Sequence, residues 1–310
     1  MKGVILAAGK GTRLYPITRH IAKPLLPIAN RPTLHYAFDR LREVGIEDIC
    51  LVVGENEAQM MDALGDGSSL GIRLTYVRQA EPKGLAHAVS FAKEFVGSDS
   101  FCLYLGDAMY SDSLAPFARR YEESGCANLN LVKWVPDPSR FGVANLDGER
   151  IVKLVEKPSV PESNYAMAGL YFFGPQIWSV LPGLQPSERG EFEITDAIQT
   201  LINQGQTVLA GVYEGAWFDT GTLDSFLETT AHLIGEDQLV AEDAHVLGGV
   251  GHSVVIGAGA HVSCGVIENS VVLPGSHIRV GGHIRRCILA GRVEADGDLE
   301  DQIRWGDSSQ

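Results

Sequence analysis

Residues 6–14 of the chain, LAAGKGTRL, place two glycines, a lysine and an arginine directly after the first apolar run. Glycines let a backbone approach a ligand closely and turn its N–H groups towards an anion. Arginine can bind a polyphosphate through two parallel hydrogen bonds, whereas lysine acts as a point charge. Together with Lys23, the side chains of Lys10 and Arg13 therefore predict a site for a phosphorylated ligand.

The spacing of these residues excludes two common phosphate-binding motifs. A P-loop needs four residues between its glycines and then Lys followed by Ser or Thr, whereas five residues separate Gly3 from Gly9, and Gly11 follows Lys10. A dinucleotide-binding turn needs its third glycine where Leu14 stands. Taken alone, the segment is also compatible with a tight turn between a strand and a helix whose basic side chains are solvated.

Carboxylates and a Glu-Lys pair supply further candidate groups. Asp107 ends the apolar run SFCLYLGD, and Asp219 lies in the apolar context WFDTG. Such an aspartate can simply cap the following helix, but Mg²⁺ also favours few carboxylates completed by substrate phosphates. Glu156 and Lys157, in VEKP, either bind a substrate or form an exposed strand end.

These residues lie on an alternation of strand-like and helix-like segments over about the first 235 residues. Apolar runs at 3–8, 48–54 and 100–107 alternate with segments of helical spacing, such as 33–46 and 84–96. This alternation predicts an α/β fold with a Rossmann-like, mainly parallel sheet and helices on both faces. Ligands of such sheets bind at the carboxyl ends of the strands, where several of the polar motifs stand.

From about residue 246 the pattern changes to an aliphatic residue at every sixth position, with frequent glycines. The two series are Val250, Ile256 and Val262, then Val266, Val272, Ile278 and Ile284. This period is typical of a hexapeptide β-helix, whose coils bury their aliphatic rows only by stacking; a β-hairpin tail is the alternative. We expect a catalytic domain at 1–237, the repeat at 238–300 and a polar tail at 301–310.

Composition limits the possible partners. The chain has 310 residues, 45% of them hydrophobic, and a formal net charge of −14, which disfavours nucleic acid and anionic membranes as partners. The apolar stretch near the start is too short for a signal peptide, and no run approaches the roughly 20 apolar residues of a membrane span. Five cysteines without a CxxC pair indicate a reduced, cytoplasmic protein. We expect the repeat to assemble a homo-oligomer.

Residues 6–32, LAAGKGTRLYPITRHIAKPLLPIANRP, closely resemble the sugar-phosphate nucleotidyltransferase signature, LAAGxGTRLxPxTxxxxKPLLPIxxxP. Other segments resemble that family's motifs in their usual order: QAEPKGLAHAV (79–89), YLGD (104–107), FGVANLD (141–147), VEKP (155–158), AGLYFF (168–173), ERGEFEITDAI (188–198) and WFDTGT (217–222). The resemblance covers about residues 1–235. GLAHAV and GEFEITD are similar to the glucose-1-phosphate thymidylyltransferase and related uridylyltransferase group, and the repeat is similar to the left-handed β-helix of its long form.

The resemblance implies a role for each matching residue. The expected catalytic residues are Arg13 on the triphosphate, Lys23 at the α-phosphate, and Asp107 and Asp219 as ligands of Mg²⁺. The expected nucleotide-binding residues are Leu6, Ala8, Gly9, Gly11, Thr12, Arg13, Gln79, Gly84 and Asp107. The expected sugar-phosphate-binding residues are Gly142, Glu156, Lys157, Gly169 and Arg189. Lys10 is a weaker candidate, because the family accepts many residues at its position.

The implied reaction transfers a nucleotidyl group from dTTP to glucose 1-phosphate and yields dTDP-glucose and pyrophosphate. A sugar phosphate is already an oxyanion at neutral pH, so the reaction needs positioning and charge neutralisation rather than a base. The alternatives are uridylyl transfer from UTP, another NDP-sugar pyrophosphorylase, or a catalytically silent sugar-nucleotide sensor.

Overall fold

The computed structural model describes residues 1–306, and these fall into two compact units. The first consists of residues 1–9 and 36–217, and the second of residues 10–35 and the chain from residue 218 onward. In this division segment 10–35 groups with the residues from 218 onward, and the domain boundary at residue 237 stays a prediction. Among the described residues, no helix is long and apolar enough to cross a membrane.

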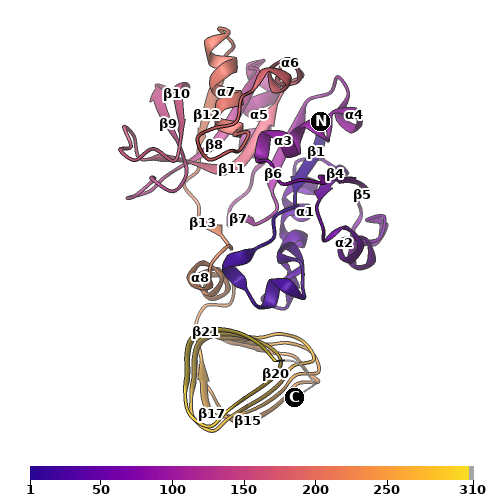
Figure 1. Ribbon diagram of the computed structural model, residues 1–310, viewed down its shortest axis with the longest axis vertical. Helices are drawn as coiled ribbons and strands as arrows, with labels where there is room; N and C mark the ends of the chain where they lie inside the picture. Colours follow the sequence, from indigo (N-terminus) through magenta and orange to yellow (C-terminus); the bar gives the residue numbers. More distant parts are fainter. Residues whose placement is uncertain (307–310) are drawn as a thin grey trace. The chain divides into compact units, whose positions relative to one another are not determined.

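The described part of the first unit contains a nine-stranded sheet in the order β5-β4-β1-β6-β11-β8-β12-β10-β9 (Figure 1). Its strands are β1 (Lys2–Leu6), β4 (Asp48–Val53), β5 (Arg73–Arg78), β6 (Phe101–Leu105), β8 (Asn128–Trp134), β9 (Gly142–Asp147), β10 (Arg150–Glu156), β11 (Tyr165–Phe173) and β12 (Val208–Val212). The shorter strands β7 (Ala108–Tyr110) and β13 (Trp217–Asp219) lie outside this sheet. The predicted α/β class is confirmed.

The sheet is parallel in one half and mixed in the other. Strands β5, β4, β1 and β6 pair in parallel, as the strand–helix alternation predicts. Strands β9, β10 and β11 instead pair in antiparallel fashion. Only Gly148 and Glu149 separate β9 from β10, and so short a connection allows an antiparallel pair but not a parallel one.

Helices cover both faces of the sheet. On one face, the core formed by Val4, Val52 and Leu103 includes residues of α3 (Leu85–Ser90), α4 (Lys93–Val96), α6 (Ile177–Val180) and α7 (Ile194–Asn203). On the other face, Tyr121 of α5 (Ala115–Ser124) stacks on Phe172 with ring centroids 5.5 Å apart. Leu41 of α1 (Thr33–Glu43) lies against Gly3, and the remaining helix of this unit is α2 (Glu57–Leu64).

Segment 10–35 of the second unit is built from short turns. It contains the 3-10 turns η1 (Thr12–Leu14), η2 (Ile17–Arg19) and η3 (Lys23–Leu25), followed by the paired short strands β2 (Pro27–Ile28) and β3 (Arg31–Pro32). Helix α8 (Leu223–Ile234) also belongs to this unit, and the side chains and backbones of Thr222 and Ser225 cap it reciprocally.

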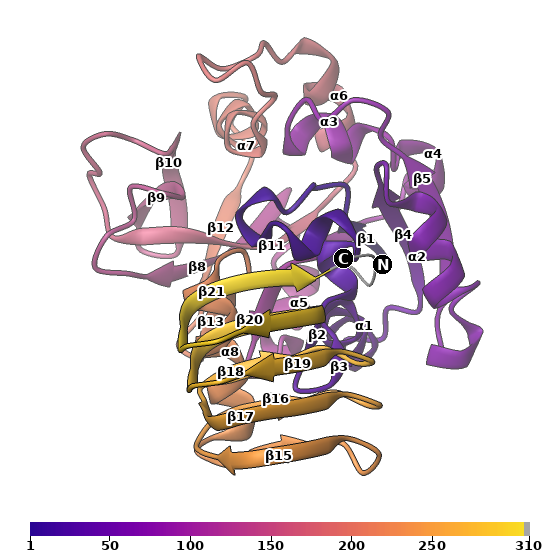
Figure 2. The same ribbon diagram turned by 60° about the horizontal axis from the view of Figure 1, so that its bottom comes forward.

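The C-terminal strands form stacked coils with a triangular outline, seen end-on in Figure 1 and from the side in Figure 2. They are β14 (Gln238–Val240), β15 (His245–Val250), β16 (Val254–Ile256), β17 (His261–Glu268), β18 (Ser270–Val272), β19 (His277–Val280), β20 (Ile284–Ala295) and β21 (Leu299–Gly306). Successive coils pair in parallel, so His245, His261 and His277 stand in register. The predicted β-helical coils are confirmed.

The interior of the coils follows the six-residue period. Of the predicted positions, Ile256, Val262, Val272, Ile278 and Ile284 are buried in its core, and Val250 packs against it. Val266 is only half-buried and does not belong to that cluster.

The polar tail expected from residue 301 begins as a strand instead. Strand β21 continues to Gly306 because its backbone pairs with β20 of the preceding coil, from Ile284↔Leu299 to Gly291↔Gly306. A polar sequence does not prevent such pairing, since backbone groups rather than side chains form it. Residues 307–310 of the expected tail lie outside the described residues.

Candidate active site

Three predicted nucleotide contacts lie where parallel strands of the first unit end. Leu6 is the last residue of β1, Gln79 directly follows β5, and Asp107 follows β6 after Gly106. The carboxyl ends of parallel strands share one edge of a sheet, which is the usual ligand-binding edge. Beyond β1, Ala8 is half-buried and Gly9 is exposed, and a Cβ atom added at Gly9 would meet nothing within 4 Å. The backbone there is open to a ligand.

Gly11, in the second unit, makes the turn that the glycine spacing predicts. Its φ is +64°, in the left-handed region that favours glycine. An added Cβ would lie 3.0 Å from Lys23 Cβ and 3.1 Å from Thr18 Cγ2. The Thr18 hydroxyl donates a hydrogen bond of 2.8 Å to the Gly11 carbonyl. Gly11 thus lets Lys23 approach the turn that begins η1 at Thr12.

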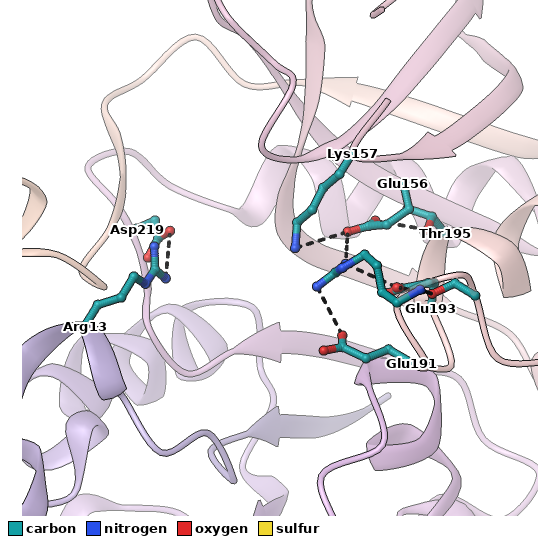
Figure 3. Close-up of polar contacts among 9 residues, drawn as sticks. Arg13, Glu156, Lys157, Glu191, Glu193, Thr195 and Asp219 are labelled. Atoms are coloured by element: carbon teal, nitrogen blue, oxygen red, sulfur yellow. Dashed lines mark hydrogen bonds and ion pairs between the residues drawn. The ribbon is translucent and has the colours of Figure 1, made fainter. Parts of the chain in front are cut away.

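Two cations of this segment converge on one carboxylate. Arg13 Nη2 lies 3.8 Å from Asp219 Oδ2, and Lys23 Nζ lies 4.0 Å from Asp219 Oδ1; Figure 3 shows the Arg13–Asp219 pair. The Lys23 side chain is only 9% exposed, whereas that of Arg13 is 53% exposed. A Cβ added at Gly221 would lie 2.6 Å from Arg13 Nη2 and 2.7 Å from Asp219 Oδ1, so a larger residue there would displace one of these two side chains.

The same carboxylate fits a divalent cation. Asp219 Oδ1 is buried and accepts no hydrogen bond within the described residues, and a buried oxygen left in this state is costly without a further partner. No cluster of three or more His, Cys, Asp or Glu side chains suited to a metal occurs in residues 1–306. A dedicated protein cage is therefore absent from that range, and Mg²⁺ commonly binds through one or two carboxylates plus substrate phosphates.

Asp107 and Glu156 both act on one phenol of the first unit. Burial raises the pKa of Tyr171, and the charges of Glu156 and Asp107 raise it further. Both carboxylates therefore contribute to the electrostatic surroundings of this residue of β11.

Gln79 contacts His87, for which the sequence pattern indicates no role. It is 5% exposed, and its Nε2 atom lies 3.0 Å from Nδ1 of His87 on α3. Burial lowers the pKa of His87, as does the charge of Lys83, while Glu81 opposes the shift. A neutral imidazole accepts at one nitrogen, so it can accept from the Gln79 amide N–H and fix the orientation of that side chain. This contact joins residues eight apart and leaves no periodic signal.

Gly84 has φ +104° and allows a close approach of protein backbone. An added Cβ would lie 2.6 Å from the Phe192 carbonyl oxygen and 2.7 Å from the Phe192 nitrogen. Ala86 N–H donates to that carbonyl, and Phe192 N–H donates to the Lys83 carbonyl. The glycine therefore joins this turn to the segment before α7, and contact of Gly84 with a nucleotide base stays a prediction.

Glu156 and Lys157 lie in a charged cluster at the end of β10 (Figure 3). Lys157 Nζ lies 3.6 Å from Glu156 Oε1, and the hydroxyl of Thr195 donates to Glu156 Oε2 at 3.1 Å. Lys157 has φ +42°, a left-handed conformation that is unusual for lysine, and its N–H donates to the Phe141 carbonyl. Such strain persists only where surrounding structure holds it, often at functional sites. Thr195, on α7, was not assigned from the sequence.

Arg189 is surrounded by acceptors. Its guanidinium lies 3.2 Å from Glu193, 3.4 Å from Glu156 and 3.4 Å from Glu191. Burial raises the pKa of Glu193, which also accepts a hydrogen bond from Ser187. With three carboxylates close by, much of the Arg189 charge is already balanced, which makes Lys157 the stronger candidate for binding a phosphate.

The two predicted sugar-binding glycines serve packing in the first unit. A Cβ added at Gly142 would lie 2.5 Å from Thr195 Cγ2 and 3.2 Å from Glu156 Oε2, so this glycine lets β9 approach the Glu156 cluster. Gly169 has φ +84°, lies against Leu105 and falls where the register of β11 shifts. Direct contact of either glycine with a sugar stays a prediction.

Comparisons with known proteins show the family to which the chain belongs. Residues 2–236 match the family model described as nucleotidyl transferase. A glucose-1-phosphate thymidylyltransferase of Streptomyces griseus is 41% identical over 260 residues, which is 81% of this chain and 72% of that protein.

Two solved structures are similar to the chain. A candidate glucose-1-phosphate thymidylyltransferase from Bacillus anthracis, solved in complex with sucrose, has a TM-score of 0.71 and 36% identity, over 75% of this chain and 94% of that one. A UDP-glucose pyrophosphorylase complexed with UDP-glucose has a TM-score of 0.69 and 28% identity, over 75% of this chain and 97% of that one.

Proposed function

Because the chain belongs to the nucleotidyl transferase family, we propose that it transfers the thymidylyl group of dTTP to glucose 1-phosphate. The products are dTDP-glucose and pyrophosphate. The observation that carries the proposal is the convergence of Arg13 and Lys23 on Asp219, whose buried Oδ1 has no hydrogen-bond partner within the described residues. Cationic side chains can bind a polyphosphate, and a carboxylate oxygen without a hydrogen-bond partner can bind the metal ion that accompanies it. The name of the Streptomyces griseus relative supports the choice of substrates.

The proposed mechanism relies on charge and position. An oxygen of the sugar phosphate attacks the α-phosphorus of the nucleotide, the new P–O bond forms in line, and the bond to pyrophosphate breaks. Lys23 stabilises the charge that develops at the α-phosphate, and Arg13 binds the departing phosphates. No general base is needed, since the attacking group is already ionised. When bound, Mg²⁺ supplies further neutralisation of the phosphate oxygens; its proposed ligands are Asp219 and Asp107.

Substrate recognition is assigned to residues of the first unit. Lys157 binds the sugar phosphate, and Glu156, oriented by Thr195, accepts hydrogen bonds from sugar hydroxyls. Gln79 presents an amide to the pyrimidine edge, where thymine and uracil offer the same donor and acceptors. UTP is therefore the second candidate donor, and the similarity to a UDP-glucose pyrophosphorylase favours it specifically.

The test is an assay of pyrophosphate release with dTTP, UTP, GTP, ATP and CTP, each against several sugar 1-phosphates. We expect dTTP with glucose 1-phosphate to give the highest kcat/KM. A higher value with UTP would assign the uridylyl reaction instead. Tight nucleotide-sugar binding without pyrophosphate release from any pair would identify a sensor and contradict the proposal.

A further inference from the structure

The last described strand of the coils contacts the segment that carries the phosphate-binding candidates. The imidazole of His20 and the indole of Trp305 stack face to face, with ring centroids 4.1 Å apart and an interplanar angle of 7°. His20 follows η2 and lies between Arg13 and Lys23 in the chain, while Trp305 lies on β21. Both residues belong to the second unit.

Other contacts tie the same part of the unit to the coils. Asn30 Nδ2 donates to the Ile256 carbonyl at 3.2 Å. Arg286, on β20, pairs with Asp301 and with Asp224, which lies in the first turn of α8. Helix α8 follows Asp219 closely in the chain. The coils therefore contact both the segment that contains Arg13 and Lys23 and the helix that follows Asp219.

We propose that Trp305 is a positioning residue for nucleotidyl transfer, because its stack on His20 holds segment 12–25 in the geometry that places Arg13 and Lys23. This inference rests on the proposed function. The segment consists of 3-10 turns, whose own hydrogen bonds hold them weakly, so its side chains depend on outside contacts for precise placement. In this role Trp305 acts through the stack with His20.

A positioning role predicts a particular kinetic pattern. Small displacements of a charged group lower the rate of a phosphoryl transfer strongly, because electrostatic stabilisation of the transition state depends on placement. We expect Trp305→Ala to lower kcat about tenfold while the KM for dTTP changes by less than about twofold. Trp305→Phe keeps a stacking ring and should retain most of the activity. Trp134→Ala is the matched control, since Trp134 is 56% exposed on β8 in the other unit.

A second measurement follows the segment itself. Amide hydrogen exchange of residues 12–25 should accelerate in Trp305→Ala and in His20→Ala, and remain as in the wild type in Trp305→Phe and Trp134→Ala. The double variant of His20→Ala and Trp305→Ala should be no slower in turnover than either single variant, because both remove one interaction.

Unchanged exchange of residues 12–25 in Trp305→Ala would overturn the inference, as would a Trp305→Phe variant as slow as Trp305→Ala. Additive losses in the double variant would also overturn it. If the wild-type chain released no pyrophosphate with any nucleotide, the proposed function would fail, whereas faster exchange in Trp305→Ala would still support the anchoring of the segment.

Discussion

Asp219 is the residue on which the proposed chemistry depends most directly. Its Oδ1 atom is buried and accepts no hydrogen bond within residues 1–306, while Lys23 Nζ stands 4.0 Å away, beyond hydrogen-bonding distance. We expect Asp219→Asn, which keeps the shape but removes the charge, to lower kcat about a hundredfold or more and to weaken Mn²⁺ binding in the presence of nucleotide. Pyrophosphate release and electron paramagnetic resonance of Mn²⁺ measure these effects.

The matched control for this change is Asp237→Asn, at an exposed position of the same unit. It should leave both measurements unchanged. Full activity in Asp219→Asn would remove Asp219 from the proposed metal site.

The contact between His87 and Gln79 predicts that nucleotide binding depends on pH. With burial holding the pKa of His87 below its ordinary value, its Nδ1 accepts from the Gln79 amide at neutral pH. As the pH falls through that lowered pKa, below about 6.5, Nδ1 gains a proton and can no longer accept. The Gln79 amide must then turn its oxygen towards His87, which reverses the groups it shows to a base. We therefore expect the KM for dTTP to rise about fivefold towards pH 5.

The variant His87→Gln should remove this dependence, because its amide does not titrate. His252→Gln, at an exposed position of the coils, is the control and should keep the wild-type profile. An identical pH profile of KM in His87→Gln and wild type would exclude His87 as its source.

At the scale of elements, helix α7 orients the carboxylate at the end of β10. The hydroxyl of Thr195 donates to Glu156 Oε2 at 3.1 Å, and Gly142 of β9 leaves room for this contact. Thr195→Val keeps the shape and removes the donor, so we expect the KM for glucose 1-phosphate to rise about fivefold to tenfold, with a smaller effect on the KM for dTTP. Initial rates at varied sugar phosphate measure this.

A matched control comes from the same helix. Thr200 donates to the Asp196 carbonyl within α7, so Thr200→Val should leave both KM values near those of the wild type. A rise that is equal for both substrates in Thr195→Val would point to general damage of the fold rather than to sugar binding.

Local patterns predicted the elements that carry their own signal. The apolar runs predicted the parallel strands β1, β4 and β6. The six-residue period predicted most of the buried residues inside the coils. The antiparallel pairs of the sheet were not predicted, because the strand–helix alternation says nothing of strands joined by two-residue turns. The strand at 299–306 was not predicted for a related reason. This polar stretch is extended only because its backbone pairs with the preceding coil.

In the candidate site, too, some features were predicted from local patterns and others were not. Glycine spacing predicted the turn at Gly11. The apolar context of Asp219 predicted a ligand of Mg²⁺, which stays a prediction. The supporting contacts of His87, Thr195 and Trp305 could not be predicted, because each joins segments that the sequence does not place together.

For the whole molecule, the division into two units predicts which residues lose protection when one unit is destabilised. Ile284 is fully buried in the coil core, which is separate from the core under the sheet. Ile284→Ala should lower the free energy of unfolding of the second unit by about 2–5 kcal/mol. Segment 10–35 belongs to that unit, so hydrogen exchange should accelerate in residues 12–25 and in the coils, while strands β1 and β6 keep their protection.

Val160→Ala is the control for this change, since Val160 is 80% exposed and lies in the first unit. It should alter neither the unfolding midpoint nor the exchange of residues 12–25. If Ile284→Ala accelerated exchange in the coils but not in residues 12–25, segment 10–35 would be stable independently of the coils. The coils would then not position Arg13 and Lys23 through Trp305.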